Sequence, residues 1–122
     1  MKIIFIAGPY RGDGSRDAKY ANIELARKYV HEFIECEIAF YSPHLNLNQE
    51  AVKFDEDKSA YAIEMNHSIL RQCDALAVLP GWRDSSGTLG EVEIMKSLGK
   101  EVFYLDEEDA FPKIISYCTK SR

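Results

Sequence analysis

Short apolar runs alternate along the chain with longer segments in which apolar residues recur every three or four positions. Four runs, at residues 2–7, 37–41, 75–79 and 101–105, predict buried strands because they are short, continuous and bounded by turn residues. The wider spacing between and after these runs predicts amphipathic helices. The expected inward positions are Ile23, Ala26, Val30 and Phe33 in the first helix; Ala62, Asn66, Ile69 and Cys73 in the second; Glu91, Ile94, Met95 and Leu98 in the third; and Phe111, Ile114, Ile115 and Cys118 in the fourth, with Asp109 as its N-cap.

Strands that alternate with helices indicate right-handed crossovers and a parallel sheet with helices on both faces. The sequence therefore predicts a single α/β domain over residues 1–122, doubly wound and flavodoxin- or Rossmann-like, with the strands in the order 2-1-3-4. A polar connection is expected from Ser42 to about Lys58. The chain contains no internal repeat and no low-complexity segment.

The predicted strand order places its switch point between the first and third strands. The glycine-rich turns at residues 8–14 and 80–87 would lie side by side there, each leading into a helix N-terminus whose free N–H groups suit an anion. Glu91 is expected in the first turn of the third helix, where the helix dipole favours an ionised carboxylate and the apolar spacing directs the side chain inward. This combination predicts a small-molecule pocket.

The side chains near these turns suit a nucleoside or nucleotide. Arg11 and the backbone N–H groups would bind a phosphate, and the sugar would lie near Glu91. Trp82 or Tyr10 would contact the base through its aromatic ring. We therefore expect a small-molecule partner of this class.

The composition limits the class of binding partner and the cellular compartment that we expect. Fifteen Lys and Arg residues against 20 Asp and Glu residues give a net charge of −5, which argues against nucleic acid as the main partner. No apolar stretch is long enough to cross a membrane or to form a signal peptide, so a cytoplasmic protein is expected. The three cysteines are far apart, and His44 and His67 lack metal-ligand spacing, so neither a disulfide framework nor a metal site is predicted.

Three motifs carry a resemblance to a known family: AGPYRG at residues 7–12, CDAL at residues 73–76 and GTLGE at residues 87–91. Together they resemble the nucleoside 2-deoxyribosyltransferase superfamily, including its small bacterial and phage proteins and the deoxynucleoside 5′-monophosphate N-glycosidases. The resemblance spans most of the chain and implies one domain that cleaves or transfers an N-glycosidic bond without a cofactor. It also implies a homodimer or larger homo-oligomer. Candidates either for that interface or for internal packing are Tyr29, Phe33, Tyr61 and Tyr117.

The resemblance implies roles for individual residues. Glu91 lies four residues after Gly87 and so takes the place of the nucleophile that attacks the anomeric carbon of the sugar. The resemblance also implies that Gly8, Arg11, Gly12 and Ser85 bind the 5′-phosphate and that Asp84 helps to recognise the base. From their place in the two turns, Pro9, Tyr10, Trp82 and Gly87 are further candidates for substrate binding.

Two positions depart from the family's pattern. The proton donor to the leaving base is usually an Asp eight residues before the position of Asp74, and Asn66 stands there. An amide cannot donate a labile proton, and losing a general acid typically costs about 10²- to 10⁴-fold in rate. Phe5 stands where a Tyr commonly hydrogen-bonds the nucleophile. Two functions therefore stay open: an enzyme in which Glu91 is the nucleophile and Asn66 orients the substrate, or a nucleotide-binding protein that senses or sequesters its ligand with little or no turnover.

Each candidate also has an ordinary structural explanation. Thr88 and Glu91 fit a capping box, in which Thr88 caps the helix and Glu91 bonds back to its backbone. The glycine-rich turns can be plain turn chemistry, Trp82 can anchor its loop, and Asn66 can belong to a buried hydrogen-bond network. His44 is expected on the surface or in a loop, with entry into the pocket rim as the alternative.

Overall fold

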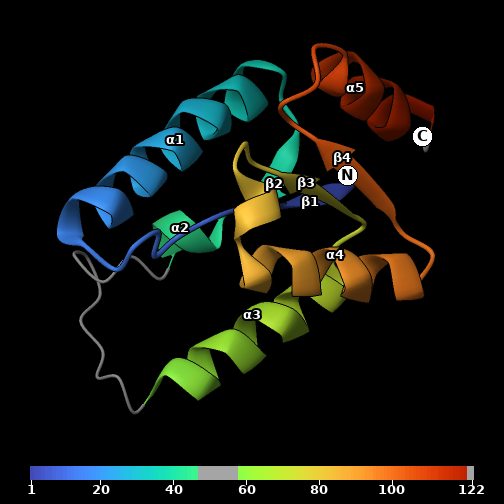
Figure 1. Cartoon of the computed structure of the whole chain (residues 1–122). Coiled ribbons are helices and arrows are strands. Elements are labelled where there is room, and N and C mark those ends of the chain that lie inside the picture. Colours follow the sequence, from blue (N-terminus) through green and yellow to red (C-terminus); the bar gives the residue numbers. More distant parts are fainter. Residues whose placement is uncertain (47–57, 121–122) are drawn as a thin grey trace.

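Strands and helices alternate along the chain in the structure, a computed structural model that describes residues 1–46 and 58–120. Figure 1 shows a central sheet with helices on both sides. The elements are β1 (Ile3–Ala7), α1 (Arg16–Glu35), β2 (Ala39–Tyr41), α2 (Pro43–Asn46), α3 (Ser59–Gln72), β3 (Ala75–Val78), the 3-10 helix η2 (Trp82–Asp84), α4 (Ser86–Ser97), β4 (Glu101–Tyr104) and α5 (Ala110–Lys120).

The four strands form one parallel sheet in the order β2-β1-β3-β4, which confirms the predicted order. Successive side chains of β1 pack on opposite faces, with Ile4 and Ile6 on one face and Phe5 and Ala7 on the other. Because helices cover both faces, β1 and β3 are apolar at every position instead of alternating with polar residues.

Helices pack on both faces of the sheet. Helices α1 and α5 cover the face of Ile4, and α3 and α4 cover the face of Phe5 (Figure 1). The buried hydrophobic residues that these helices contribute are Ile23, Ala26, Val30 and Phe33 of α1, Leu70 of α3, Val92 and Met95 of α4, and Ala110 and Ile114 of α5. No helix among the described residues is long and apolar enough to cross a membrane.

The strand boundaries lie close to the prediction. The second strand begins at Ala39 and not at residue 37, because Glu37 has a φ of 55° and closes α1 by donating its N–H to the carbonyl of Ile34. β3 and β4 each end one residue earlier than expected, although Leu79 and Leu105 still donate their N–H groups to the neighbouring strand.

The expected polar connection after β2 begins with a short helix, α2, and its residues 47–57 lie outside the described part of the chain. His44 of α2 is only 3% exposed, so the expectation of a surface or loop position is wrong. Its burial results from the packing of α2 against α1 and β1, two elements that are distant in the sequence. Local sequence pattern does not encode such contacts.

Helix α4 begins earlier than the capping-box interpretation requires. Ser85 is the N-cap, because its Oγ accepts the N–H of Thr88 at 3.2 Å. Glu91 therefore lies in the second turn of α4 and not in the first, and the capping box between Thr88 and Glu91 is wrong. Leu98, expected to point inward, is 48% exposed at the C-cap. The buried stripe of α4 consists of Thr88, Val92 and Met95.

Most of the aromatic side chains considered for an interface pack internally. Phe33 is fully buried, and the ring of Tyr29 stacks on that of Phe111 with centroids 6.5 Å apart. The hydroxyl of Tyr117 donates to a main-chain carbonyl just before β3 at 3.2 Å. Tyr61 differs from these residues, because 61% of it is exposed.

Candidate functional site

The two glycine-rich turns meet at the carboxyl edge of the sheet. We call residues 8–14, which follow β1, the β1 turn, and residues 80–87, which follow β3, the β3 turn. A Cβ added at Gly8 would lie 2.7 Å from the Cβ of Leu79, and one added at Gly81 would lie 3.4 Å from the Cγ of Pro9. The two turns are therefore in contact, as the strand order predicts.

Two side chains hold the carbonyl groups of the β1 turn. The Nε2–H of His44 donates to the carbonyl of Pro9 at 2.7 Å, and the Nδ2–H of Asn22 donates to the carbonyl of Tyr10 at 3.0 Å. The imidazole also packs on the Tyr10 ring, with centroids 5.6 Å apart. The two hydrogen bonds hold the peptide groups between Pro9 and Tyr10 and between Tyr10 and Arg11 in a fixed orientation.

The same contacts orient the N–H groups of the β1 turn. The carbonyl of Arg11 accepts the N–H of Gly14 at 2.8 Å, and the structure has no cis peptide among its described residues. In a trans peptide the N–H points opposite to the carbonyl, so the N–H groups of Arg11 and Gly12 point away from the groups that hold the Tyr10 and Arg11 carbonyls. Neither N–H has a hydrogen-bond acceptor among residues 1–46 and 58–120. Adjacent N–H groups in such a turn form an anion-binding arrangement.

Gly12 requires its glycine for two reasons. Its φ is 56°, a left-handed conformation that side chains rarely adopt, and a Cβ would lie 2.8 Å from the Cβ of Ala18 in α1. The following helix is capped by Ser15, whose Oγ accepts the N–H of Ala18 at 3.1 Å. The turn therefore has a defined shape that the start of α1 stabilises.

The β3 turn leads through η2 into α4. Ser85 accepts hydrogen bonds from both the N–H and the hydroxyl of Thr88, the latter at 2.9 Å. These bonds occupy the lone pairs of the Ser85 oxygen and leave its own proton to be donated to a ligand. Asp84 and Gly87 of the same turn are exposed, as is Arg11 of the β1 turn.

Glu91 is half-buried one helical turn beyond Thr88, on the side of α4 that faces the core. Its carboxyl group makes no hydrogen bond or ion pair with any residue that the structure describes. Burial raises the pKa of Glu91 from an ordinary value of 4.5 to about 7. The expected stabilisation of the ionised form by the helix dipole is therefore wrong, because that effect fades beyond the first turn and loss of hydration dominates here.

Asn66 lies on α3, the helix that packs beside α4 (Figure 1). Its Oδ1 atom is buried and has no hydrogen-bond partner among the described residues, so the structural network considered for this residue is not formed through that atom. An unpaired buried acceptor costs about 1 to 3 kcal/mol. This cost makes Oδ1 a site where a donor from a ligand is expected.

The indole ring of Trp82 packs against side chains of the protein. Its centroid lies 5.0 Å from that of Tyr104, and the Arg83 guanidinium lies 4.4 Å above the indole. Arg83 is itself paired with Asp106 at 3.2 Å. Trp82 thus anchors its loop against β4, while its buried Nε1–H has no acceptor in the described part of the chain. The indole N–H is the group of Trp82 that is left for a ligand.

Tyr41 brings a hydroxyl group to the face where Phe5 has none. The parallel register pairs Phe5 with Tyr41, and the two rings lie 5.5 Å apart. The Tyr41 oxygen accepts the Nδ2–H of Asn46 at 2.6 Å, and burial raises the pKa of the Tyr41 phenol, so the phenol keeps its proton. Tyr41 also packs against the core cluster that contains Val92, the residue after Glu91.

Sequence reasoning missed Asn22, Tyr41 and the buried position of His44. Asn22 precedes the buried Ile23, so a polar residue beside the apolar face of α1 was the available signal. For Tyr41 the signal was its place at the end of a strand beside Phe5. The hydrogen bond of His44 to Pro9 crosses 35 positions of sequence and has no local signal.

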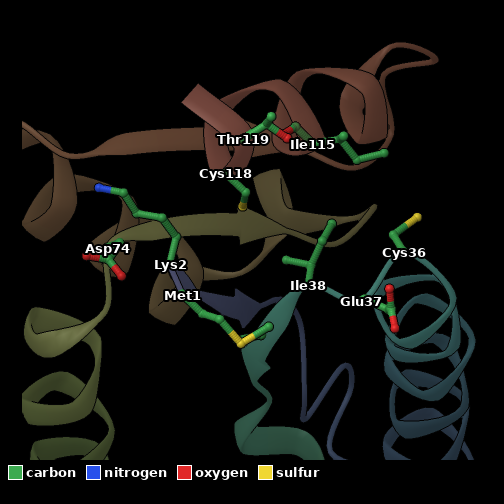
Figure 2. A pocket seen from close by; sticks show the side chains of 10 residues that line it. Met1, Lys2, Cys36, Glu37, Ile38, Asp74, Ile115, Cys118 and Thr119 are labelled. Atoms are coloured by element: carbon green, nitrogen blue, oxygen red, sulfur yellow. The ribbon is translucent and has the colours of Figure 1, made fainter. Parts of the chain in front are cut away.

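A separate cavity of about 350 Å³ lies at the opposite, amino edge of the sheet. Figure 2 shows its lining side chains coming from the start of β1, the segment between α1 and β2, the residue before β3, and α5. Among them are Met1, Lys2, Ile38, Asp74, Ile115 and Cys118. This cavity is distinct from the site around Glu91. In residues 1–46 and 58–120 no group of three His, Cys, Asp or Glu side chains is arranged to hold a metal ion.

The sheet order and the two-sided helix layers define a Rossmann-like parallel α/β protein. The chain belongs to the family described as a domain of unknown function, DUF7768, whose model matches residues 2–105. The match includes all four strands and both glycine-rich turns and ends before α5. No curated protein matches the chain.

Proposed function

We propose that the protein cleaves or transfers the N-glycosidic bond of a nucleoside or nucleoside 5′-monophosphate, with Glu91 as the nucleophile. The observation that carries this proposal is the half-buried Glu91 carboxyl, which has no partner among the described residues and lies in α4, the helix that follows the β3 turn. The β3 turn is in contact with the β1 turn. The motifs that resemble the nucleoside 2-deoxyribosyltransferase superfamily include both of these turns and Glu91.

The chemistry needs one carboxylate and one proton source. Ionised Glu91 attacks the anomeric carbon as the bond to the base breaks, and the electron pair of that bond leaves with the base, which takes up a proton. The transition state resembles an oxocarbenium ion, which the carboxylate stabilises. Water, or a second base, then attacks the same carbon and releases Glu91 as carboxylate, with the proton of the attacking group passing to solvent. The products are a free base and a sugar, or a new nucleoside.

In this proposal the phosphate of a 5′-monophosphate binds at the two turns. The N–H groups of Arg11 and Gly12, the Arg11 guanidinium and the Ser85 hydroxyl are all donors, and the N-terminus of α4 adds a partial positive charge. These groups support phosphate binding at the start of α4, in the same helix that carries Glu91 in its second turn.

Asn66 and Tyr41 have separate roles in the proposed reaction. The Asn66 amide orients the base or a sugar hydroxyl, since its Oδ1 needs a donor. It cannot supply the labile proton that the leaving base takes up. In this proposal the Tyr41 phenol, which burial keeps protonated, donates that proton or hydrogen-bonds Glu91.

The test compares base release by the wild-type protein with that by Glu91→Gln. The matched control is Glu93→Gln, because Glu93 is exposed two residues further along α4. Each protein is incubated with a panel of nucleosides and 5′-monophosphates, and free base is measured by chromatography. We expect Glu91→Gln to lose at least about 10³-fold in rate and Glu93→Gln to keep the wild-type rate. Wild-type activity should rise with pH through about 7, where Glu91 ionises. Unchanged turnover in Glu91→Gln would exclude Glu91 as the nucleophile.

Nucleotide binding without turnover is the second candidate function. It is favoured by Asn66, an amide where this chemistry needs an acid. The same panel separates the two functions when calorimetry is run beside the base-release assay. Binding of a nucleotide with no free base from the wild-type protein, at any pH, would support a sensing or sequestering role.

A further inference from the structure

The β1 turn depends on two side chains that lie outside it. His44 comes from α2 and Asn22 from α1, and each donates one hydrogen bond to a carbonyl of the turn, at 2.7 Å to Pro9 and at 3.0 Å to Tyr10. His44 is 3% exposed, so no solvent replaces its bond to Pro9. The orientation of these peptide groups is therefore set by tertiary contacts.

The protonation state of His44 follows from its contacts. A carbonyl only accepts, so the proton lies on Nε2, and Nδ1 carries a lone pair. Burial lowers the pKa of His44, which keeps the imidazole neutral near pH 7. Its Nδ1 is buried and has no partner among residues 1–46 and 58–120, so the bond to Pro9 and the contact with the Tyr10 ring hold the ring in place.

Loss of a donor would change what the turn presents to an anion. A carbonyl without its partner can turn towards the ligand side, and because the N–H lies opposite the carbonyl, that rotation takes an N–H group away from the ligand and brings an oxygen towards it. Asn22 controls the peptide that carries the Arg11 N–H, and His44 controls the one before it. A peptide group that has rotated in this way points its carbonyl oxygen at the ligand. The partial negative charge of that oxygen repels a phosphate but has little effect on an uncharged nucleoside.

We propose that His44 and Asn22 are positioning residues that make the site selective for phosphorylated ligands, by holding the Pro9 and Tyr10 carbonyls away from the anion. The inference rests on the proposed function only for the ligand class. It requires no turnover, so it is tested by binding.

The experiment measures dissociation constants by calorimetry for a nucleoside 5′-monophosphate, the matching nucleoside and inorganic phosphate. His44→Leu and Asn22→Leu are each expected to weaken monophosphate and phosphate binding by about 10- to 100-fold, with less than about a threefold change for the nucleoside. His44→Gln is expected to keep the wild-type ratio, because the glutamine Nε2–H can replace the imidazole donor. His31→Leu is the control, since His31 is exposed on α1.

Amide NMR supplies a second measurement that a general loss of stability would not reproduce. In the wild-type protein, added inorganic phosphate should shift the resonances of the Arg11 and Gly12 amides, and these shifts should disappear in His44→Leu and in Asn22→Leu. If His44→Leu does not fold, Asn22→Leu and His44→Gln still give the comparison.

The outcomes separate this inference from the proposed function. An unchanged ratio of monophosphate to nucleoside affinity in both leucine variants overturns the inference, even if the protein is an active glycosidase. Failure of the wild-type protein to bind phosphate in any form also overturns it. A changed ratio in a protein that releases no base supports the inference and counts against catalysis.

Discussion

At the scale of the single residue, ionisation of the half-buried Glu91 carboxyl costs free energy. A carboxyl group that is half-buried without a hydrogen-bond donor loses hydration when it ionises, and its pKa rises to about 7. Ser85 explains why no capping bond relieves this cost, because it takes the N-cap position and places Glu91 in the second turn. The residue is therefore near its ionisation midpoint at neutral pH, where a group can act both as nucleophile and as leaving group.

We predict that Glu91→Gln stabilises the fold at alkaline pH. The folded-state pKa of about 7 lies above the ordinary value of 4.5, so the protonated carboxyl favours folding below about pH 4.5 and this contribution is lost as the pH rises through 7. Glutamine cannot ionise, and the variant should be more stable than wild type by roughly 1 to 3 kcal/mol at about pH 8. The two should be nearly equal at about pH 4.5.

Urea unfolding at the two pH values measures this difference. Glu93→Gln is the control and should differ little from wild type at either pH, because Glu93 is exposed. A stability difference between wild type and Glu91→Gln that does not change with pH would show that Glu91 is not buried as described.

At the scale of elements, the site is made by two turns and the helices that follow them. The β1 turn is shaped by His44, Asn22 and the start of α1, and the β3 turn by the capping interaction of Ser85 with Thr88. The two turns meet where Gly81 lies against Pro9, and Gly8 of the β1 turn lies against Leu79, directly after β3. Any side chain at Gly8 has to move the β1 turn away from Leu79.

We predict that Gly8→Ala destabilises the protein by about 1 to 3 kcal/mol, the usual cost of overpacking. The new Cβ would lie 2.7 Å from the Cβ of Leu79, an atom that cannot move without its backbone. Gly90→Ala is the matched control in α4, because a Cβ there has no atom within 4 Å and alanine favours a helix. Thermal unfolding should show a lowered midpoint for Gly8→Ala and an equal or raised one for Gly90→Ala. Equal behaviour of the two variants would mean that Gly8 is not packed against Leu79.

At the scale of the whole molecule, α5 belongs to the same core as the sheet although the family match ends at residue 105. Ile114 and Ala110 are buried against Phe103, and Phe111 packs edge-on to Phe33 of α1 at 5.1 Å. The helix also lines the cavity at the amino edge of the sheet. The Glu91 site lies at the opposite, carboxyl edge. Changes at α5 should therefore affect stability more than ligand binding.

We predict that Ile114→Ala costs about 2 to 5 kcal/mol of unfolding free energy, since the fully buried side chain would leave a cavity. Ile115→Ala, next to it in α5 and 43% exposed, should change stability by less than about 0.5 kcal/mol. Chemical denaturation followed by circular dichroism gives both values. Similar losses for the two variants would contradict the packing of Ile114 into the core.

The fold could be predicted because its signals are local and periodic. The apolar runs at β1 and β3 and the helical spacing of Ile23, Ala26, Val30 and Phe33 indicate the elements, and alternation of strands with helices determines a parallel sheet. The order β2-β1-β3-β4 then brings the two turns to one edge. The cap of α4 was mispredicted because Ser85 and Thr88 are both good N-cap residues, and only the observed hydrogen bond decides between them.

The sequence by itself thus determined the strand order, the meeting of the two turns and the candidate acid. The tertiary structure decided the burial of His44, the raised pKa of Glu91, the unpaired Oδ1 of Asn66 and the cavity at the amino edge. The physical reason is the range of the interactions. Periodicity is a property of neighbours along the chain, whereas burial, hydration and hydrogen-bond partners depend on residues that come together only when the sheet and its helices have packed.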